Sequence, residues 1–100
     1  MSVLGGLSEP KKATPEIQAM TDSVEAAARQ MAGQDFDMFK ATLYRDQVVA
    51  GMNYFIKVHV GGPKYVHLRV FQALPQADQP PRLDAMQLNK TATDPITYFE

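Results

Sequence analysis

The pattern of hydrophobic and polar residues changes once along the chain, from a helical period to an alternating one. Between Thr14 and Gly33, apolar residues recur every three or four positions, and most charged residues fall outside that stripe. Thr14 suits a helix N-cap, Pro15 suits the first helical turn, and Gly33 suits a helix end. The segment is therefore predicted to be one long amphipathic helix, whose alanines allow close packing against a sheet.

After Gly33, apolar and polar residues alternate, which is typical of strands with one buried face. Strands are predicted over residues 39–44, 53–60, 66–70 and 83–88. The last seven residues, 94–100, have two interpretations: a final edge strand, or a segment that pins the terminus. The pattern predicts an α+β fold in which a four- to five-stranded antiparallel sheet wraps around one long N-terminal α-helix.

The first thirteen residues have no periodic pattern. Residues 1–13 mix glycine, proline and charge, so they are predicted to be a flexible arm of a single domain spanning 1–100. The arm carries Val3, Leu4 and Leu7, and exposed aliphatic residues on such an arm dock either on the body or on a partner. Loose packing against the body suits Leu7 best.

An uncharged run separates the first two predicted strands. It consists of Gln47, Val48, Val49, Ala50 and Gly51. The two valines favour β-structure, and Gly51 suits a turn. Two explanations are open: Val48 and Val49 finish one strand and begin the next, or they form an apolar hairpin tip that binds a partner.

The directions of consecutive antiparallel strands help to decide between these two explanations. If consecutive strands pair, the run at 47–51 and the loop that begins at Leu74 and Pro75 lie at the same end of the sheet, whereas Gly61 and Gly62 lie at the other end. Two neighbouring apolar loops and an aliphatic arm favour a binding surface.

Composition and charge exclude several classes of function. Ten basic and eleven acidic residues give a net charge of −1, and the basic residues are dispersed along the sequence. Neither nucleic acid nor a membrane is therefore an expected partner. The chain has no cysteine, which excludes disulfides and thiolate chemistry and is compatible with a reducing compartment. Because the start resembles neither a signal peptide nor a membrane span, the expected location is the cytoplasm.

No catalytic or metal-binding constellation is evident. His59 and His67 each stand alone at a polar-side position of a strand, where a histidine is expected to be hydrogen-bonded or solvent-facing. Asp35 and Asp37 suit a solvated turn. We therefore expect no metal, no cofactor and no enzyme activity. A protein-binding module that accepts a partner strand at an exposed sheet edge is one functional class that stays open.

Three stretches of the chain carry a family resemblance. They are Gly5-Gly6-Leu7-Ser8-Glu9 with Ala13-Thr14-Pro15-Glu16-Ile17-Gln18; Gln47-Val48-Val49-Ala50-Gly51 with Asn53-Tyr54-Phe55-Ile56-Lys57-Val58; and Val66-His67-Leu68-Arg69-Val70-Phe71 with Leu74-Pro75. Together they resemble the stefins, the type 1 cystatins that inhibit papain-like cysteine proteases, and in particular the vertebrate A and B kinds. The likeness spans nearly the whole chain.

The resemblance implies a cystatin-like fold and a reversible, tight-binding, competitive inhibitor that blocks the protease cleft with a three-part wedge and no covalent chemistry. The implied partners are papain and cathepsins L, B, H and S. The implied protease-binding residues are Val3, Leu4, Gly5, Gly6, Gln47, Val48, Val49, Ala50, Gly51, Leu74 and Pro75. Either Gly5 or Gly6 is the hinge of the arm, and spacing favours Gly5. The alternative is a non-inhibitory binding module that uses the sheet edge.

The expected state is mainly monomeric, with a domain-swapped dimer as a second form. If the tip is strained, opening it into one continuous strand over residues 39–60 relieves that strain.

Overall fold

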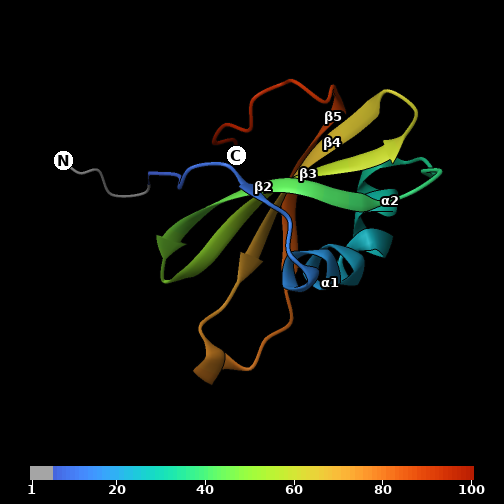
Figure 1. The fold of residues 1–100 in the computed structure, drawn as a ribbon. Helices are drawn as coiled ribbons and strands as arrows, with labels where there is room; N and C mark the ends of the chain where they lie inside the picture. Colours follow the sequence, from blue (N-terminus) through green and yellow to red (C-terminus); the bar gives the residue numbers. More distant parts are fainter. Residues whose placement is uncertain (1–5) are drawn as a thin grey trace.

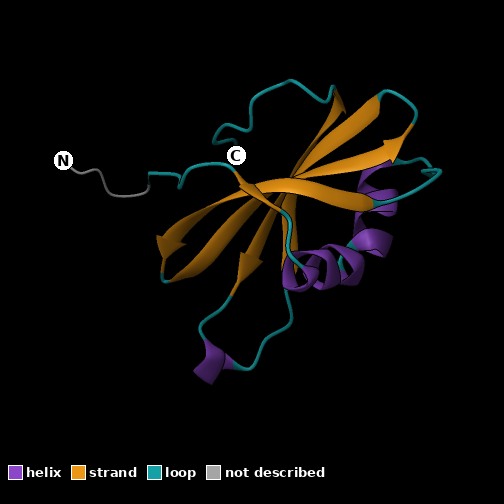
Figure 2. Cartoon of the chain, in the orientation of Figure 1, coloured by secondary structure: helices purple, strands orange, loops and turns teal. Residues whose placement is uncertain are grey.

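The computed structural model describes residues 6–100, so Val3, Leu4 and Gly5 of the predicted site lie outside the described residues. The described chain forms a five-stranded antiparallel sheet with the strands in chain order, and helices cross one of its faces (Figures 1 and 2). The elements are β1 (Lys11–Lys12), α1 (Pro15–Ser23), α2 (Glu25–Ala32), β2 (Lys40–Val49), β3 (Gly51–Gly61), β4 (Lys64–Gln72), the 3-10 turn η1 (Pro75–Ala77) and β5 (Arg82–Lys90). The antiparallel meander is as predicted.

The predicted long helix begins and ends where the sequence indicates. The backbone N–H of Ile17 donates to Thr14 Oγ1 at 3.2 Å, which caps the first turn. At the other end Gly33 adopts a left-handed conformation with φ of 69°, the usual helix stop. The end signals therefore identified both boundaries.

Between those ends, the prediction of one long helix is corrected to two short helices that meet at Val24. Val24 has φ of −109° and ψ of 9°, and its N–H donates to Thr21 O at 3.2 Å, three residues back instead of four. The hydroxyl of Thr21 donates to Ile17 O at 2.7 Å, a contact that bends helices. Apolar periodicity did not indicate the break, because Val24 keeps its place in the buried stripe.

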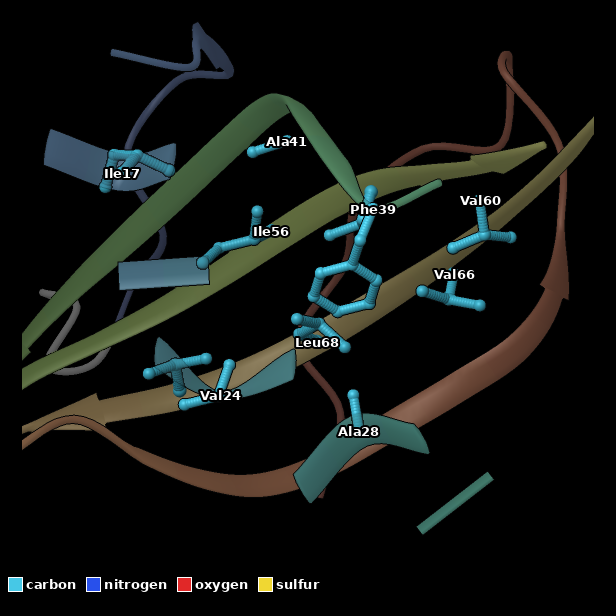
Figure 3. Close-up of a cluster of buried hydrophobic side chains, with 11 residues drawn as sticks. Ile17, Val24, Ala28, Phe39, Ala41, Ile56, Val60, Val66 and Leu68 are labelled. Carbon is cyan, nitrogen blue, oxygen red and sulfur yellow. The ribbon is translucent and has the colours of Figure 1, made fainter. Parts of the chain in front are cut away.

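The core lies between the two helices and one face of the sheet (Figure 3). Its buried side chains are Ile17, Val24, Ala28, Phe39, Ala41, Ile56, Val58, Val60, Val66, Leu68 and Val70. Alternate residues of β3 and β4 fill it, as the alternating pattern predicts for strands with one apolar face. Ala28 is fully buried, and its small side chain allows α2 to approach the sheet closely.

The fifth strand comes from the predicted arm. Lys11 and Lys12 pair with Tyr44 and Leu43 of β2. The pairing continues toward the tip of the next hairpin, because Ser8 N donates to Asp46 O at 2.8 Å. The chain from Ser8 to Lys12 therefore lies along β2, and at Ser8 it is close to the end of that strand.

The end of the chain pins the second face of the sheet and forms no strand within residues 91–100. Phe55 is fully buried, and its ring lies 5.5 Å from the ring of Tyr98 and 5.6 Å from that of Phe99, centre to centre. Ile96 is buried in the same segment, and its carbonyl accepts a hydrogen bond from Arg45. Of the two interpretations of 94–100, the structure has the pinned terminus.

A buried lysine holds the start of this segment. Lys57 is 2% exposed, and its ammonium donates to the carbonyl oxygens of Thr91, Ala92 and Asp94 at 3.1, 2.7 and 2.6 Å. Burial lowers the pKa of Lys57, and the nearby carboxylate of Asp94 partly opposes that shift. The three oxygens replace the water that the ammonium loses.

We predict that Lys57→Met lowers the free energy of unfolding by about 1–3 kcal/mol, because methionine keeps an unbranched apolar stem but takes away the donor shared by three carbonyl groups. Urea unfolding at pH 7 measures the change. Lys64→Met, at an exposed position, is the control and should stay within about 0.5 kcal/mol of the parent. Equal effects of the two substitutions would contradict the role given to Lys57.

Candidate functional site

The β2–β3 hairpin ends in an exposed apolar tip. Val48 pairs with Met52 and Val49 with Gly51, so Ala50 alone connects the two paired strands. Val48 is 75% exposed and Val49 is 40% exposed. The two valines are the last residues of β2, but their side chains do not pack in the core. Stiff, branched side chains left in water at the end of a hairpin are suited to burial by a partner.

Gly51 closes the tip against the neighbouring strand. Its φ of +123° is one that residues with a side chain rarely adopt. A Cβ atom added there would also lie 2.6 Å from Gln72 O and 2.9 Å from Cζ of Phe71. Both the backbone angle and the close approach of β4 therefore require glycine at this position.

Gln47 does not share the exposure of the tip. It is 7% exposed, and its Oε1 accepts a hydrogen bond of 2.8 Å from Nδ2 of Asn53, which is 5% exposed. The two residues are directly opposite on β2 and β3. The structure thus places this predicted site residue behind the tip, in a buried amide pair at its base.

The second predicted loop begins beside that base. Gln72, the last residue of β4, pairs with Met52 next to the tip. Leu74 follows and is 45% exposed, and Pro75, also exposed, opens the turn η1. The amide of Gln72 donates to Gln79 O at 3.1 Å, which ties the return of the loop to its start. The tip and this loop project from the same end of the sheet, as the antiparallel pairing of consecutive strands predicts (Figure 2).

The described part of the arm meets β2 just before the tip. Ser8 O accepts from Arg45 Nε at 2.8 Å, and Ser8 Oγ accepts from Asp46 N at 2.9 Å. Gly6 is exposed and Leu7 is half-buried, in line with the expected packing of Leu7 against the body. The arm, the tip and the second loop therefore all start from one end of the sheet.

The two histidines lie elsewhere and differ from each other. His59 is half-buried, with Nε2 2.7 Å from Gly62 O and its ring stacked on Tyr65. His67 is fully buried on the sheet face that residues 91–100 cover, and its ring nitrogens have no hydrogen-bond partner among the described residues. The expectation of a hydrogen-bonded or solvent-facing histidine fits His59 and is wrong for His67, because the alternation of a strand does not show that its polar side will be covered too.

Within residues 6–100, no cluster of three or more histidine, aspartate or glutamate side chains is placed to hold a metal ion. The same part of the chain has no helix long and apolar enough to cross a membrane.

Comparison with known proteins identifies the family. The cystatin domain model matches residues 5–94. The chain belongs to the cystatin family. It is 50% identical over 95 residues to leukocyte cysteine proteinase inhibitor 1 of Sus scrofa, an alignment that covers 95% of this chain and 92% of that protein. The resemblance to the stefins is thereby confirmed.

Two further relatives show the same extent of similarity. Stefin-C of Bos taurus is 47% identical over 96 residues, covering 96% of this chain and 95% of that protein. Cystatin-B of Homo sapiens is 46% identical over 95 residues, covering 95% and 97%. These names describe an inhibitor, a stefin and a cystatin, and the expectation that the chain is not an enzyme agrees with them.

We predict that Gly51→Ala lowers the free energy of unfolding by about 1–3 kcal/mol more than Gly62→Ala does, because the added methyl group at residue 51 meets β4 backbone and a φ of +123° is harder for alanine to adopt than a φ of +52°. Gly62 is the control: its φ is also positive, but a Cβ there would meet nothing within 4 Å. Urea unfolding of both variants gives the difference. Equal losses would contradict the special requirement for glycine at residue 51.

We also predict a pH dependence of stability that originates at His67. Burial, together with Lys57 and Lys90, lowers the pKa of His67 from 6.5 to about 4, while Asp94 and Gln87 oppose the shift. Between those two pH values the unfolded chain binds a proton that the folded chain does not. The contribution of His67 to stability is therefore full above pH 6.5 and is lost as the pH falls toward 4.

Urea midpoints measured from pH 7 to pH 4 test this. His67→Leu should flatten the decline relative to the parent protein, whereas His59→Leu, at the half-buried histidine, should leave it in place. A decline of unchanged slope in His67→Leu would refute the assignment.

Proposed function

We propose that this protein inhibits papain-like cysteine proteases reversibly, tightly and competitively, by placing an apolar wedge in the active-site cleft. The observation that carries the proposal is the exposure of Val48 and Val49 on a closed hairpin tip, at the same end of the sheet as the exposed Leu74 and Pro75. The class of target is supported by similarity to the Sus scrofa protein named leukocyte cysteine proteinase inhibitor 1.

Desolvation supplies the affinity in this mechanism. Apolar surface buried in a concave cleft contributes roughly 25 cal/mol per Å², before the costs of ordering are subtracted. Those costs are low at the tip, because valine has few rotamers and the hairpin holds the backbone in place. Protease–inhibitor contacts typically bury roughly 800 Å² on each partner, which two loops and an arm can provide.

The proposed wedge has three parts with different places in the cleft. The tip, made of Gln47, Val48, Val49, Ala50 and Gly51, enters beside the catalytic cysteine of the protease. Leu74 and Pro75 cover the primed side. Val3, Leu4, Gly5 and Gly6 follow the unprimed side, and the bonds of Ser8 to Asp46 support this because they hold the described start of the arm near the base of the tip.

Inhibition in this proposal is occlusion without chemistry. The inhibitor presents no scissile peptide to the protease thiolate, so it dissociates intact. Papain and cathepsins L, B, H and S are the expected targets. The monomer is the active form, and a domain-swapped dimer that opens the tip into a continuous strand loses inhibition. The cytoplasmic location stays a prediction.

Titration of papain with the purified protein tests the function. We expect competitive inhibition by the parent protein, and a loss of about a hundredfold or more in affinity for Val48→Asp and for Val49→Asp, because each substitution would bury an unpaired carboxylate in the cleft.

Met31→Asp is the matched control, since Met31 is an equally apolar residue, 50% exposed, on α2 away from the tip. It should inhibit like the parent. Full protease activity in micromolar excess of the parent protein would refute the proposal. If instead a partner bound with an affinity indifferent to both valine substitutions, the sheet-edge module would be the better explanation.

A further inference from the structure

The position of the tip cannot be set by its own side chains. Val48 and Val49 are exposed, and the described backbone bonds between the arm and β2 reach only as far as Asp46. A hairpin end with no buried side chain would fray unless something behind it held the two strands together. The described residues immediately behind the tip therefore decide how well it is fixed.

A buried amide pair stands at that place. Asn53 Nδ2 donates to Gln47 Oε1 at 2.8 Å across the two strands of the hairpin. Both residues are nearly inaccessible, at 5% and 7% exposure. A hydrogen bond shielded from water is costly to break, because water cannot readily replace either partner. The pair thus fixes the spacing and register of the strands one residue before Val48.

An aromatic ring supports the other side of the turn. Phe71 pairs with Asn53 across β3 and β4, and its ring reaches the position where a side chain on Gly51 would stand. The guanidinium of Arg82 lies 5.0 Å from the centre of the Phe71 ring, and Arg82 Nε donates to Asp84 at 2.6 Å. The ring is therefore held from β5 while it lies against Gly51.

We propose that Gln47 and Asn53 are positioning residues, whose buried amide pair, backed by Phe71, fixes the Val48–Val49 backbone before a protease arrives. The inference rests on the proposed function and deepens it. Gln47, the first residue of the tip sequence, fixes the tip through its bond to Asn53, in addition to its place in the proposed wedge. A tip fixed in advance loses less conformational entropy on docking, which strengthens inhibition.

The test compares Asn53→Leu, Gln47→Leu and the double variant with the parent protein. We expect either single leucine substitution to weaken papain inhibition about tenfold, because the hydrogen bond between Gln47 and Asn53 is lost. The double variant should lose less than the sum of the two singles.

Amide hydrogen exchange of the free protein gives a readout that needs no protease. Exchange at Val49 and Gly51 should quicken in Asn53→Leu, while exchange at Ile56 and Leu68 in the sheet should not change. If the parent fails to inhibit papain, the proposed function falls, and this measurement still decides whether the amide pair fixes the tip.

Gln18→Leu is the matched control. Gln18 also bonds to β2 through its side-chain amide, accepting from Ala41 N at 2.8 Å and donating to Phe39 O at 3.2 Å, but at the far end of the strand. It should lower stability without changing inhibition or exchange at the tip. Three results would overturn the proposal: equal loss of inhibition in Gln18→Leu, unchanged exchange at the tip in Asn53→Leu, or unchanged inhibition by both leucine variants.

Discussion

The double pairing of β3, with β2 on one side and β4 on the other, is the constraint on which the rest of the structure depends. It extends to the tip, because Met52 pairs with Val48 and with Gln72. Two loops far apart in the sequence therefore share one strand as their base. Because β4 pairs with β3 up to the tip, its backbone lies so close to Gly51 that there is no room for a side chain. A shift of β4 relative to β3 would change the position of Leu74 relative to the valines. The relative position of the two loops therefore depends on the register of the sheet.

The same strand also joins the two faces of the sheet. Ile56 and Val58 point into the core beneath the helices, whereas Phe55 and Lys57 receive the chain end on the opposite side. A domain of this size gains stability by covering both faces of its central strands, since few residues are available for one core. The covering has a consequence for charge: polar side chains of β3 and β4 that alternation assigns to solvent become buried, and each then needs a partner or a neutral state.

This explains how far the sequence could predict the structure. Alternation and end signals identified the four long strands, the boundaries of the helical region and the two loops at one end, because these features are local. The break at Val24, the short strand β1 and the buried state of His67 depend on contacts between distant segments, which leave no periodic trace. The sequence left open whether Val48 and Val49 finish a strand or form an apolar tip, and the structure has them both at the end of β2 and exposed. The pairing of Gln47 with Asn53 was not predicted, although the two stand symmetrically about the turn, and that symmetry was the available signal.

An exposed apolar hairpin end carries a risk that the fold has to limit. Unpaired strand edges next to apolar side chains promote association with other strands. Here the outer edge of β2 is covered by β1 and by Ser8, and the charged pair of Lys11 with Asp46, 3.1 Å apart, stands along that edge. The described backbone bonds along this edge thus reach Asp46, two residues before Val48. The covered and charged part of the edge offers little to an added strand, whereas the exposed valine side chains beyond it are available for burial by a partner.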